Sequence, residues 1–470
     1  MKTSASENTF KRFYSNFRIA VLGLEKDFVS GSIDRAIFML SVPMILEMVM
    51  ESLFAVVDVF FVAKLGVEAV AAVGLTEAMI MLMYAVCAGL SMGVTAMVSR
   101  RIGEKKNKEA ADVAYQSILI GVFISLVIGI VGVVYARDLL RLMGGSEELI
   151  RGGYRFTQVL MGGNVTIMLL FILNAVYRGA GDASIAMRAL WVSNGLNLVL
   201  DPLFIFGIGA WDGFGLHGAA IATTIGRGVG VAYQLYILLN GKGVITLVKK
   251  NMVFRWKIMT RLVRISLGGM GQYFIGTASW IFLVRIISHF GSDAMAGYTI
   301  AIRIIVFTIL PAWGISNAAA TLVGQNLGAD QPQRAEQSVW KCAVYNMIFL
   351  FTVSVVFFVF ADFLVSIFNA EGVVLQHGVN ALRYICAGYV FYAYGMVVSQ
   401  AFNGAGDTRT PTIVNFFVYW MLQIPLAYVL AMFTTFEIKG AYIAILAAEI
   451  LLAIVIVLLF RKGRWKLVKV

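Results

Sequence analysis

The chain has 470 residues, of which 60% are hydrophobic and 14% are charged, and its mean hydropathy is +0.84. A soluble protein needs more charge than this to cover its surface, so the composition excludes a water-soluble globular protein. The net charge of +12 does not indicate nucleic-acid binding, because the basic residues stand at the ends of apolar runs and form no polar patch. We therefore expect the lipid bilayer, and no nucleic acid, among its partners.

Twelve apolar runs are long enough to cross a membrane, since a spanning helix needs roughly 20 apolar residues. They cover residues 36–62, 70–98, 111–136, 154–177, 185–210, 218–241, 262–288, 295–325, 338–366, 380–402, 412–434 and 440–460. Lys and Arg gather before the first run and after the second, sixth and twelfth, which all lie on one side of the membrane. By the positive-inside rule that side is the cytosol, where both termini are expected. The sequence predicts an all-α, multi-pass membrane protein.

This pattern divides the chain into five segments. A cytosolic N-terminal segment at 1–35, which we expect at the membrane surface, precedes a six-helix bundle at 36–241. A cytosolic linker at 242–261 leads to a second six-helix bundle at 262–460 and a basic cytosolic tail at 461–470. The three cysteines, Cys87, Cys342 and Cys386, lie far apart and lack the spacing of a metal or redox site, and we expect no cofactor.

The two halves of the chain repeat each other. Gly179-Ala180-Gly181-Asp182 recurs as Gly404-Ala405-Gly406-Asp407, an offset of 407 − 182 = 225. The same offset pairs Ser41 with Ser266, Gly66 with Gly291, and Gly103 with Gly328, and later the register slips slightly, so that Pro202 matches Pro425 and Gly218 matches Gly440. Six crossings separate equivalent points, so the halves have the same orientation. We expect a pseudo-two-fold axis along the membrane normal and a cavity between the bundles.

Three acidic residues lie within the first span. A charge at the centre of a span costs about 2.5–3.5 kcal/mol on insertion scales, so such residues are informative. Glu47, Glu51 and Asp58 fall within about 40° of one another on the helix, which places them on one stripe. That stripe should face protein or a water-filled cavity. Pro43 precedes it and interrupts the backbone hydrogen bonding, so we expect a hinge there.

A second polar group combines the fifth and sixth spans. Asn197 and Asp201 are four residues apart on one face of the fifth span, and the sixth span adds Thr223. Carboxylate, amide and hydroxyl oxygens are ligands of hard cations, and neighbouring carboxylates also favour proton binding. Both Na+ and H+ are chemically reasonable at this group, and Na+ is the metal ion we would expect.

The repeat serves as a control for these polar residues. The offset sets Asp58 against Leu283, and the later register sets Asp201 against Ile424 and Thr223 against Ile445. The second half adopts the fold without these groups, which favours a functional role for Asp58 and Asp201. For Glu47 and Glu51 two interpretations stay open: a functional site, or a wetted wall of the cavity.

Other charged residues have more ordinary explanations. Glu77, Arg227, Arg285, Arg303 and Glu449 lie within spans or near their ends, where snorkelling or pairing between helices is the commoner explanation. The two Gly-Ala-Gly-Asp segments fit turns between helices better than phosphate-binding loops.

Several motifs resemble those of the multidrug and toxic compound extrusion family. They are Ser41-Val42-Pro43, Val57-Asp58, Lys64-Leu65-Gly66, Arg178-Gly179-Ala180-Gly181-Asp182, Asn197-Leu198-Val199-Leu200-Asp201-Pro202, Gly218-Ala219-Ala220-Ile221-Ala222-Thr223 and Asn403-Gly404-Ala405-Gly406-Asp407-Thr408. Each motif alone is weak, but their order and spacing together are specific. The resemblance covers nearly the whole chain.

The resemblance implies a cation-driven antiporter, with Na+ or H+ as the coupling ion, that exports amphiphilic, often cationic compounds by alternating access. It implies a multi-pass protein of the bacterial or archaeal cytoplasmic (inner) membrane. By position, it implies a cation-coupling site at Asp58, Asn197, Asp201 and Thr223. The family's substrate cavity maps onto Glu51 and Asn174, and we add the nearby Glu47 and Phe54 as candidate cavity residues.

Three positions depart from the family pattern. Phe54 stands where some members place an aromatic hydroxyl, which removes a cation ligand. The seventh span reads Gly271-Gln272-Tyr273-Phe274 and lacks the acid of some members, which speaks against an ion site in the second bundle. Glu51 stands where a neutral Gln is familiar, and its charge would favour cationic substrates.

The alternatives come from other functional classes. A flippase for lipid-linked precursors would have a similar fold but a more basic cavity, and a passive channel would not accumulate substrate against a gradient. An intramembrane enzyme lacks support, because the chain has no HExxH motif and no paired His and Cys within spans. We expect a monomeric transporter whose partners are small amphiphilic or cationic compounds and the lipid bilayer.

Overall fold

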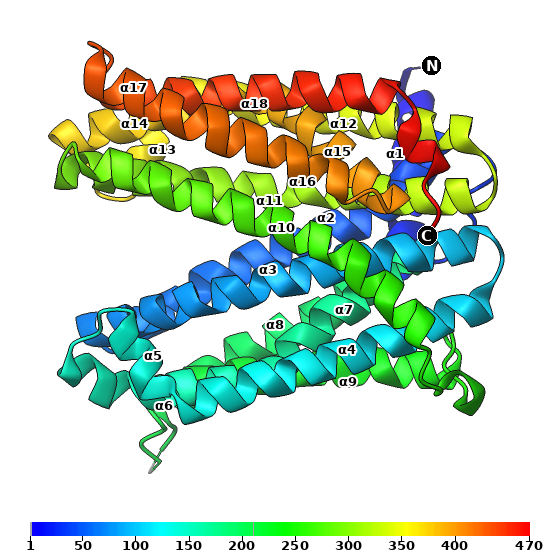
Figure 1. The fold of residues 1–470 in the computed structure, drawn as a ribbon, viewed down its shortest axis with the longest axis horizontal. Helices are drawn as coiled ribbons and strands as arrows, with labels where there is room; N and C mark the ends of the chain where they lie inside the picture. Colours follow the sequence, from blue (N-terminus) through cyan, green and yellow to red (C-terminus); the bar gives the residue numbers. More distant parts are fainter. Residues whose placement is uncertain (1, 210) are drawn as a thin grey trace.

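The computed structural model describes the backbone of residues 2–209 and 211–470, and their side chains except those of residues 2–11, 55, 56, 58, 59 and 67. Within this part the chain forms long, nearly parallel helices in two bundles (Figure 1). Ten helices are long and apolar enough to cross a membrane, and the pair α14 and α15, bent by 53°, makes an eleventh among the described residues. The less apolar α9 completes the set, so each of the twelve expected spans contains helix, although the helix of the fifth span ends at Phe206, before the expected boundary.

The N-terminal bundle contains the helices of the first half. They are α2 (Ile33–Ala63), α3 (Val67–Gly103), α4 (Asn107–Val134), α5 (Ala136–Leu142), α6 (Glu147–Gly162), α7 (Asn164–Ala180), α8 (Ala183–Phe206) and α9 (Leu216–Asn240). The fourth expected span is divided into α6 and α7 by a break at Gly163. All of these helices except α4 and α5 line the cavity between the bundles, so they position the site.

The C-terminal bundle repeats this order. It contains α10 (Trp256–Ser288), α11 (Ser292–Gly328), α12 (Pro332–Val359), α13 (Ala361–Ser366), α14 (Gly372–Cys386), α15 (Tyr389–Ala405), α16 (Arg409–Asn415), the π-helix η2 (Phe416–Gln423), α17 (Ile424–Phe433) and α18 (Ile438–Arg461). Short 3-10 turns lie at η1 (Lys249–Asn251) and η3 (Arg464–Leu467). Helix α10 begins at Trp256, six residues before the expected span, because its first basic turn can stay helical outside the lipid.

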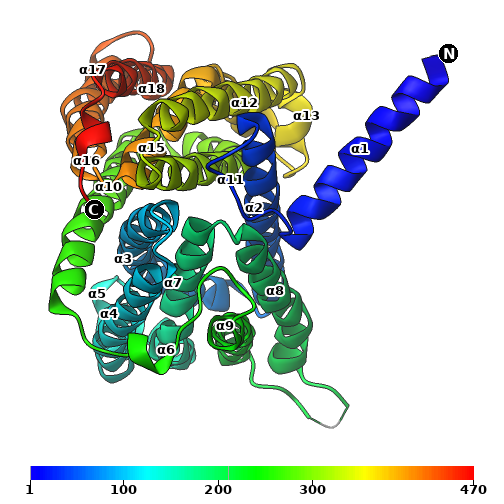
Figure 2. The same ribbon diagram turned by 90° about the vertical axis from the view of Figure 1, so that its right-hand side faces the viewer.

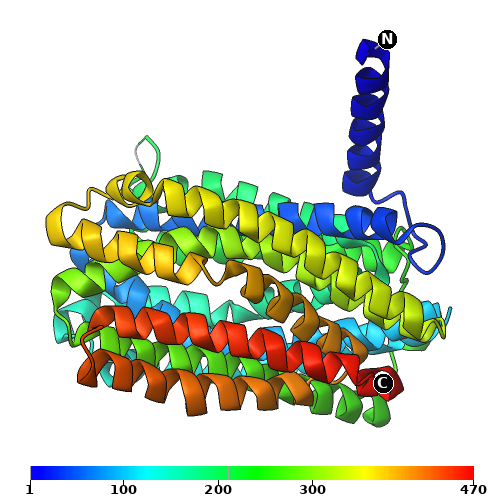
Figure 3. The same cartoon turned by 90° about the horizontal axis from the view of Figure 1, so that it is seen from above.

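Helix α1 (Lys2–Leu22) contacts α2 and extends away from both bundles. It projects sideways, almost perpendicular to the spanning helices (Figures 2 and 3). Its described part exposes Phe13, Tyr14 and Phe17 beside Arg12 and Arg18. Apolar and basic residues on one helix at right angles to the spans are typical of a segment that lies on a membrane surface.

Backbone conformation confirms the 225-residue register. Left-handed residues terminate helices at equivalent positions of the two halves, where the chain must turn sharply. The pairs are Gly66 (φ 102°) with Gly291 (φ 97°), Lys105 (φ 59°) with Asp330 (φ 59°), Gly144 (φ 86°) with Asn369 (φ 55°), and Gly181 (φ 86°) with Gly406 (φ 89°). The last pair belongs to the Gly-Ala-Gly-Asp segments, which are therefore turns between helices, as expected.

The first helix of each half packs against the other half. Helix α10 lies along α3, and α2 lies along α11, as the view along the bundles shows (Figure 2). Glycines allow this close approach: a Cβ on Gly89 would lie 2.4 Å from Met270 N, and one on Gly314 would lie 2.7 Å from Ile45 N. The two contacts are equivalent, because Gly314 lies 225 residues after Gly89 and Met270 lies 225 residues after Ile45. Such a reciprocal pair of contacts indicates a pseudo-two-fold axis.

The two bundles meet at the end that carries both termini, which we call the closed end. It is formed by the last turns of α3, α7, α11 and α15 (Figure 1). Hydrogen bonds join the bundles there: Thr321 donates to Arg178 O (3.1 Å), Gln325 to Gly179 O (3.0 Å), and Arg100 to Ala405 O (3.4 Å). A Cβ on Gly103 would lie 2.0 Å from Gln325 O, and one on Gly328 would lie 2.2 Å from Arg100 O, so backbone meets backbone twice.

We predict that Gly103→Ala and Gly328→Ala weaken the closed end. Each added methyl group meets a carbonyl oxygen, and such overpacking costs about 1–3 kcal/mol. The midpoint of thermal unfolding in detergent should fall for both variants. Gly74→Ala in α3 is the control, because its Cβ would meet nothing within 4 Å. Unchanged midpoints for all three variants would contradict the packing.

Candidate functional site

A cavity of about 590 Å³ lies between the bundles. Its N-terminal wall comes from α2, α3, α6, α7, α8 and α9, and its C-terminal wall from α10, α11 and α15. The four expected cavity residues, Glu47, Glu51, Phe54 and Asn174, all line it, together with Thr223 of the expected cation group. Glu47 and Glu51 of the acid stripe therefore face a cavity rather than lipid.

Glu47 is buried in a polar network at the base of this cavity. Its Oε1 accepts a hydrogen bond from Asn174 Nδ2 (3.0 Å) and lies 3.5 Å from Arg178 NH1. Asn174 Oδ1 in turn accepts one from Gln234 Nε2 (2.6 Å). Glu47 is 1% exposed and Arg178 12% exposed, so this ion pair is largely shielded from water. Arg178 offsets the charge that the sequence assigned to Glu47 alone.

Glu51 lies next along α2 and is also paired. Its Oε2 accepts from Asn194 Nδ2 (3.2 Å), and its Oε1 lies 3.7 Å from Arg227 NH2. The Arg227 guanidinium also lies 5.8 Å from the centre of the Phe54 ring, within the range of a cation–π contact. Arg227 therefore points into the cavity and pairs between helices rather than snorkelling. Its charge offsets the negative charge through which Glu51 was expected to favour cations.

The expected cation group is partly described. Asn197 Nδ2 donates to Asp201 Oδ1 (3.1 Å) and to Thr223 Oγ1 (3.2 Å), so the structure brings these three residues together across α8 and α9. Asp201 and Asn197 are fully buried. The side chain of Asp58 lies outside the described residues, so its place in the group stays a prediction.

Pro43, the expected hinge, lies inside a continuous helix α2. Met44 and Ile45, which follow it, lie in close contact with Gly314 of α11. The proline therefore lies where the first helix passes against the other bundle. A hinge role for Pro43 stays a prediction.

Sequence reasoning missed the basic partners of the acids. Arg178 appeared only within a motif, and Asn194 and Gln234 were not singled out. The signal for Arg227 was present, because an arginine inside a span must find a partner in the membrane. The identity of that partner depends on the packing of α9 against α2, which one sequence does not reveal.

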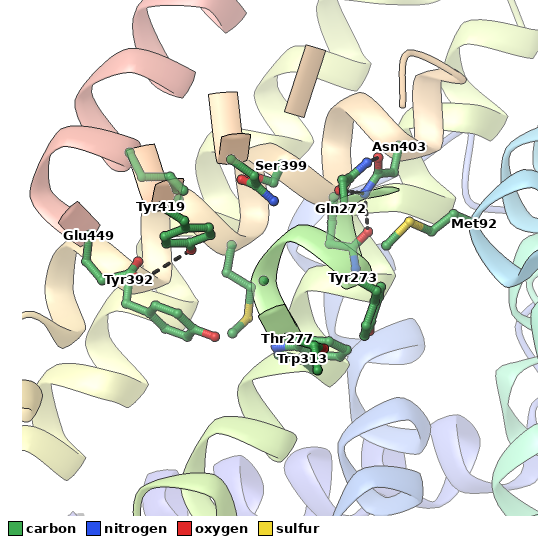
Figure 4. A pocket seen from close by; sticks show the side chains of 16 residues that line it. Met92, Gln272, Tyr273, Thr277, Trp313, Tyr392, Ser399, Asn403, Tyr419 and Glu449 are labelled. Atoms are coloured by element: carbon green, nitrogen blue, oxygen red, sulfur yellow. Dashed lines mark hydrogen bonds between the residues drawn. The ribbon is translucent and has the colours of Figure 1, made fainter. Parts of the chain in front are cut away.

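A second, smaller pocket lies in the C-terminal bundle (Figure 4). It has a volume of about 280 Å³ and is lined by Gln272, Tyr273, Trp313, Tyr392, Tyr419 and Glu449, among others. Gln272 and Asn403 exchange hydrogen bonds of 2.9 Å and 3.2 Å. These two amides hold the positions of Glu47 and Arg178, since 272 − 47 and 403 − 178 both equal 225. The C-terminal bundle thus keeps the contact but not the charges.

Family comparison agrees with this architecture. A family model described as MatE matches residues 43–203 and 270–429, one stretch in each half. The chain belongs to the MatE family. It is therefore a multi-pass membrane transporter built from two bundles, and not an enzyme.

Relatives and solved structures cover nearly the whole chain. It is 25% identical over 435 residues to the probable multidrug resistance protein NorM of Thermotoga maritima, covering 92% of this chain and 93% of NorM. A crystal structure of a MATE transporter superposes with a TM-score of 0.88 at 27% identity, covering 94% of this chain and 99% of that one. A MOP-superfamily transporter from Pyrococcus furiosus, described as having a binding pocket of reverse polarity, superposes with a TM-score of 0.87 at 27% identity, covering 93% and 97%.

We predict that Arg178→Met lowers the free energy of unfolding by about 3–5 kcal/mol, because it leaves Glu47 buried without its cation. Arg178→Met combined with Glu47→Gln should recover part of that loss. The measurement is thermal or denaturant unfolding of the purified protein in detergent.

The control for this prediction is Arg383→Met at the surface pair with Asp362, whose side chains are 36% and 65% exposed. Surface pairs contribute about 0–1 kcal/mol, so this variant should change little. Losses that simply add in the double variant would show that Glu47 and Arg178 are not coupled.

Proposed function

We propose that this protein is an antiporter that uses an inward cation gradient, of Na+ or H+, to export amphiphilic and mostly cationic compounds by alternating access. Family membership makes it a transporter related to multidrug exporters. The coupling ion and the substrate class are our proposal. It is carried by the hydrogen-bonded group of the buried Asn197 and Asp201 and the half-buried Thr223, which the C-terminal bundle lacks.

The chemistry of this group supports cation binding. Among the described residues, Asn197 Oδ1 is buried and accepts no hydrogen bond, so one neutral oxygen is available beside the Asp201 carboxylate. Amide and carboxylate oxygens are ligands for Na+, and a carboxylate at membrane depth can also take up a proton. With Asp58 as a further ligand, as the family resemblance implies, the N-terminal bundle would hold the coupling ion.

Two helices connect this group with the substrate cavity. Helix α8 carries Asn197 and, one turn away, Asn194, which bonds Glu51. Helix α9 carries Thr223 and, one turn away, Arg227, which pairs with Glu51. A cation that draws Asn197 and Thr223 together therefore also moves both partners of Glu51. Such a shared contact gives cation and substrate different affinities in two states, which coupling requires.

The cavity and the relatives do not favour a lipid-linked precursor flippase. A pyrophosphate group would need unpaired basic residues, whereas Arg178 and Arg227 each lie beside a glutamate. The Thermotoga maritima relative is named as a probable multidrug resistance protein. We further propose that the protein acts as a monomer in a prokaryotic inner membrane, with the closed end and both termini in the cytosol.

We predict that Asp201→Asn strongly reduces gradient-driven transport. The neutral amide lacks the negative charge that attracts Na+, and it cannot take up and release a proton. Purified protein in liposomes should accumulate a cationic fluorescent dye under an imposed Na+ gradient or an imposed H+ gradient, tested separately. The variant should lose at least about tenfold in initial rate, which corresponds to about 1.4 kcal/mol.

Asp362→Asn is the matched control, because this acid is exposed and pairs only at the surface with Arg383. It should transport like the parent protein. Undiminished dye uptake by Asp201→Asn under both gradients would contradict the proposal that Asp201 couples transport to the cation. Accumulation of an anionic dye in preference to the cationic one would overturn the substrate class instead.

A further inference from the structure

Glu449 is an acid of the C-terminal bundle that the proposed coupling group does not use. It lies on α18, which begins at Ile438, as α9 begins at Leu216, an offset of 222. The same offset, 449 − 227, sets Glu449 against Arg227. At this equivalent position the N-terminal bundle has a basic side chain and the C-terminal bundle has an acidic one.

The environments of these two charges differ. Arg227 has Glu51 beside it, whereas the residue equivalent to Glu51 is Gly276, since 276 − 51 = 225. A Cβ on Gly276 would meet nothing within 4 Å, so the missing side chain leaves open space in the pocket. Helix α10 therefore brings no partner to Glu449.

The carboxylate of Glu449 is half satisfied. Its Oε1 accepts a hydrogen bond from the Tyr419 hydroxyl (3.2 Å), whose residue lies in the π-helix η2. Its Oε2 is buried and has no hydrogen-bond partner among the described residues, which also offer it no ion pair. A lone carboxylate within a span is costly in its charged form, and a bound cation would offset that cost.

Aromatic rings form the rest of the pocket. Tyr392 and Tyr419 lie near Glu449 on one side, and Tyr273 and Trp313 lie along another (Figure 4). The Tyr273 and Trp313 rings meet edge to face with centroids 5.7 Å apart. Aromatic faces attract organic cations, and a carboxylate among several rings is the arrangement that recognises alkylated ammonium groups.

The pocket also borders the central cavity. Tyr273, Trp313 and Asn403 line both the 280 Å³ pocket and the 590 Å³ cavity. An amphiphilic molecule can therefore place its charged end beside Glu449 while its apolar part stays in the cavity between the bundles. The pocket offers one carboxylate and several rings, rather than the six or more oxygens that a divalent metal ion takes.

We propose that the pocket around Glu449 binds the alkylammonium group of an organic cation, with Glu449 as its counter-charge and the rings of Tyr392 and Tyr419 as its walls. This inference rests on the proposed function in one respect, namely that the substrates are cationic. It places the charge recognition in the C-terminal bundle, whereas Arg178 and Arg227 balance the acids of the N-terminal wall.

The test is isothermal titration calorimetry on the purified full chain with two probes of matched shape. Choline carries a trimethylammonium group, and 3,3-dimethylbutan-1-ol is its uncharged carbon analogue. Choline should bind at least about tenfold more tightly than the alcohol, a difference of about 1.4 kcal/mol. Glu449→Gln, which keeps the shape and an acceptor for Tyr419, should remove this difference.

Two further variants locate the site. Gly276→Leu should fill the open space and weaken choline binding, while Glu371→Gln, an exposed glutamate of the same half, should leave it unchanged. Because Glu449→Gln and Gly276→Leu alter different helices, either one that folds carries the test. Unchanged choline affinity in the folded variant, or equal binding of the alcohol, overturns the proposal.

The same measurements separate this inference from the proposed function. Asp201→Asn should retain choline binding, because it alters only the coupling group. If choline binding depends on Glu449 but no ion gradient drives transport, the pocket proposal stands and the antiport proposal fails. If Glu449→Gln retains both gradient-driven dye export and choline binding, the antiport proposal stands and the pocket proposal fails.

Discussion

Charge buried at membrane depth is the constraint on which the functional part of this structure depends. Each acid within the lipid must find hydrogen bonds or a cation, because water is absent there. In the N-terminal bundle Glu47 and Glu51 find Arg178 and Arg227, and Asp201 finds Asn197. The helices that bring these partners are therefore held beside α2 in this structure, and the cavity takes its shape from them.

The internal repeat shows how one architecture supports two chemical environments. Equivalent positions hold an ion pair in one bundle and a pair of amides in the other, and an arginine in one bundle and a glutamate in the other. The backbone turns and the glycine contacts are kept throughout. Packing thus requires small residues and sharp turns at fixed places, while the polar side chains are free to diverge with function.

Much of the fold was predictable from the sequence, because span length and turn residues are local properties. The twelve spans, the register of 225 and the turn role of the Gly-Ala-Gly-Asp segments were expected and observed. The cavity residues were also found, since acids in lipid must face an interior. The pairing of Arg227 with Glu51 was not predictable, because it depends on how α9 meets α2 and not on either helix alone.

The C-terminal pocket illustrates the same limit. The alignment of the two halves indicates which polar residues the second half lacks, but not which ones it has gained. Glu449 was expected to snorkel or to pair between helices, whereas it is buried with Tyr419 as its hydrogen-bond partner, a contact that depends on the π-helix η2. An extra residue per turn in that segment is a feature of backbone geometry that periodicity in one sequence does not reveal.

The glycine contacts at the closed end also affect how the protein can move. Gly103 touches Gln325 O and Gly328 touches Arg100 O, so at these two points peptide groups meet without interlocked side chains. Two surfaces that meet in this way can separate without any rotamer having to change first. These backbone contacts therefore offer little resistance to separation of the bundles. The resistance comes instead from the hydrogen bonds around them.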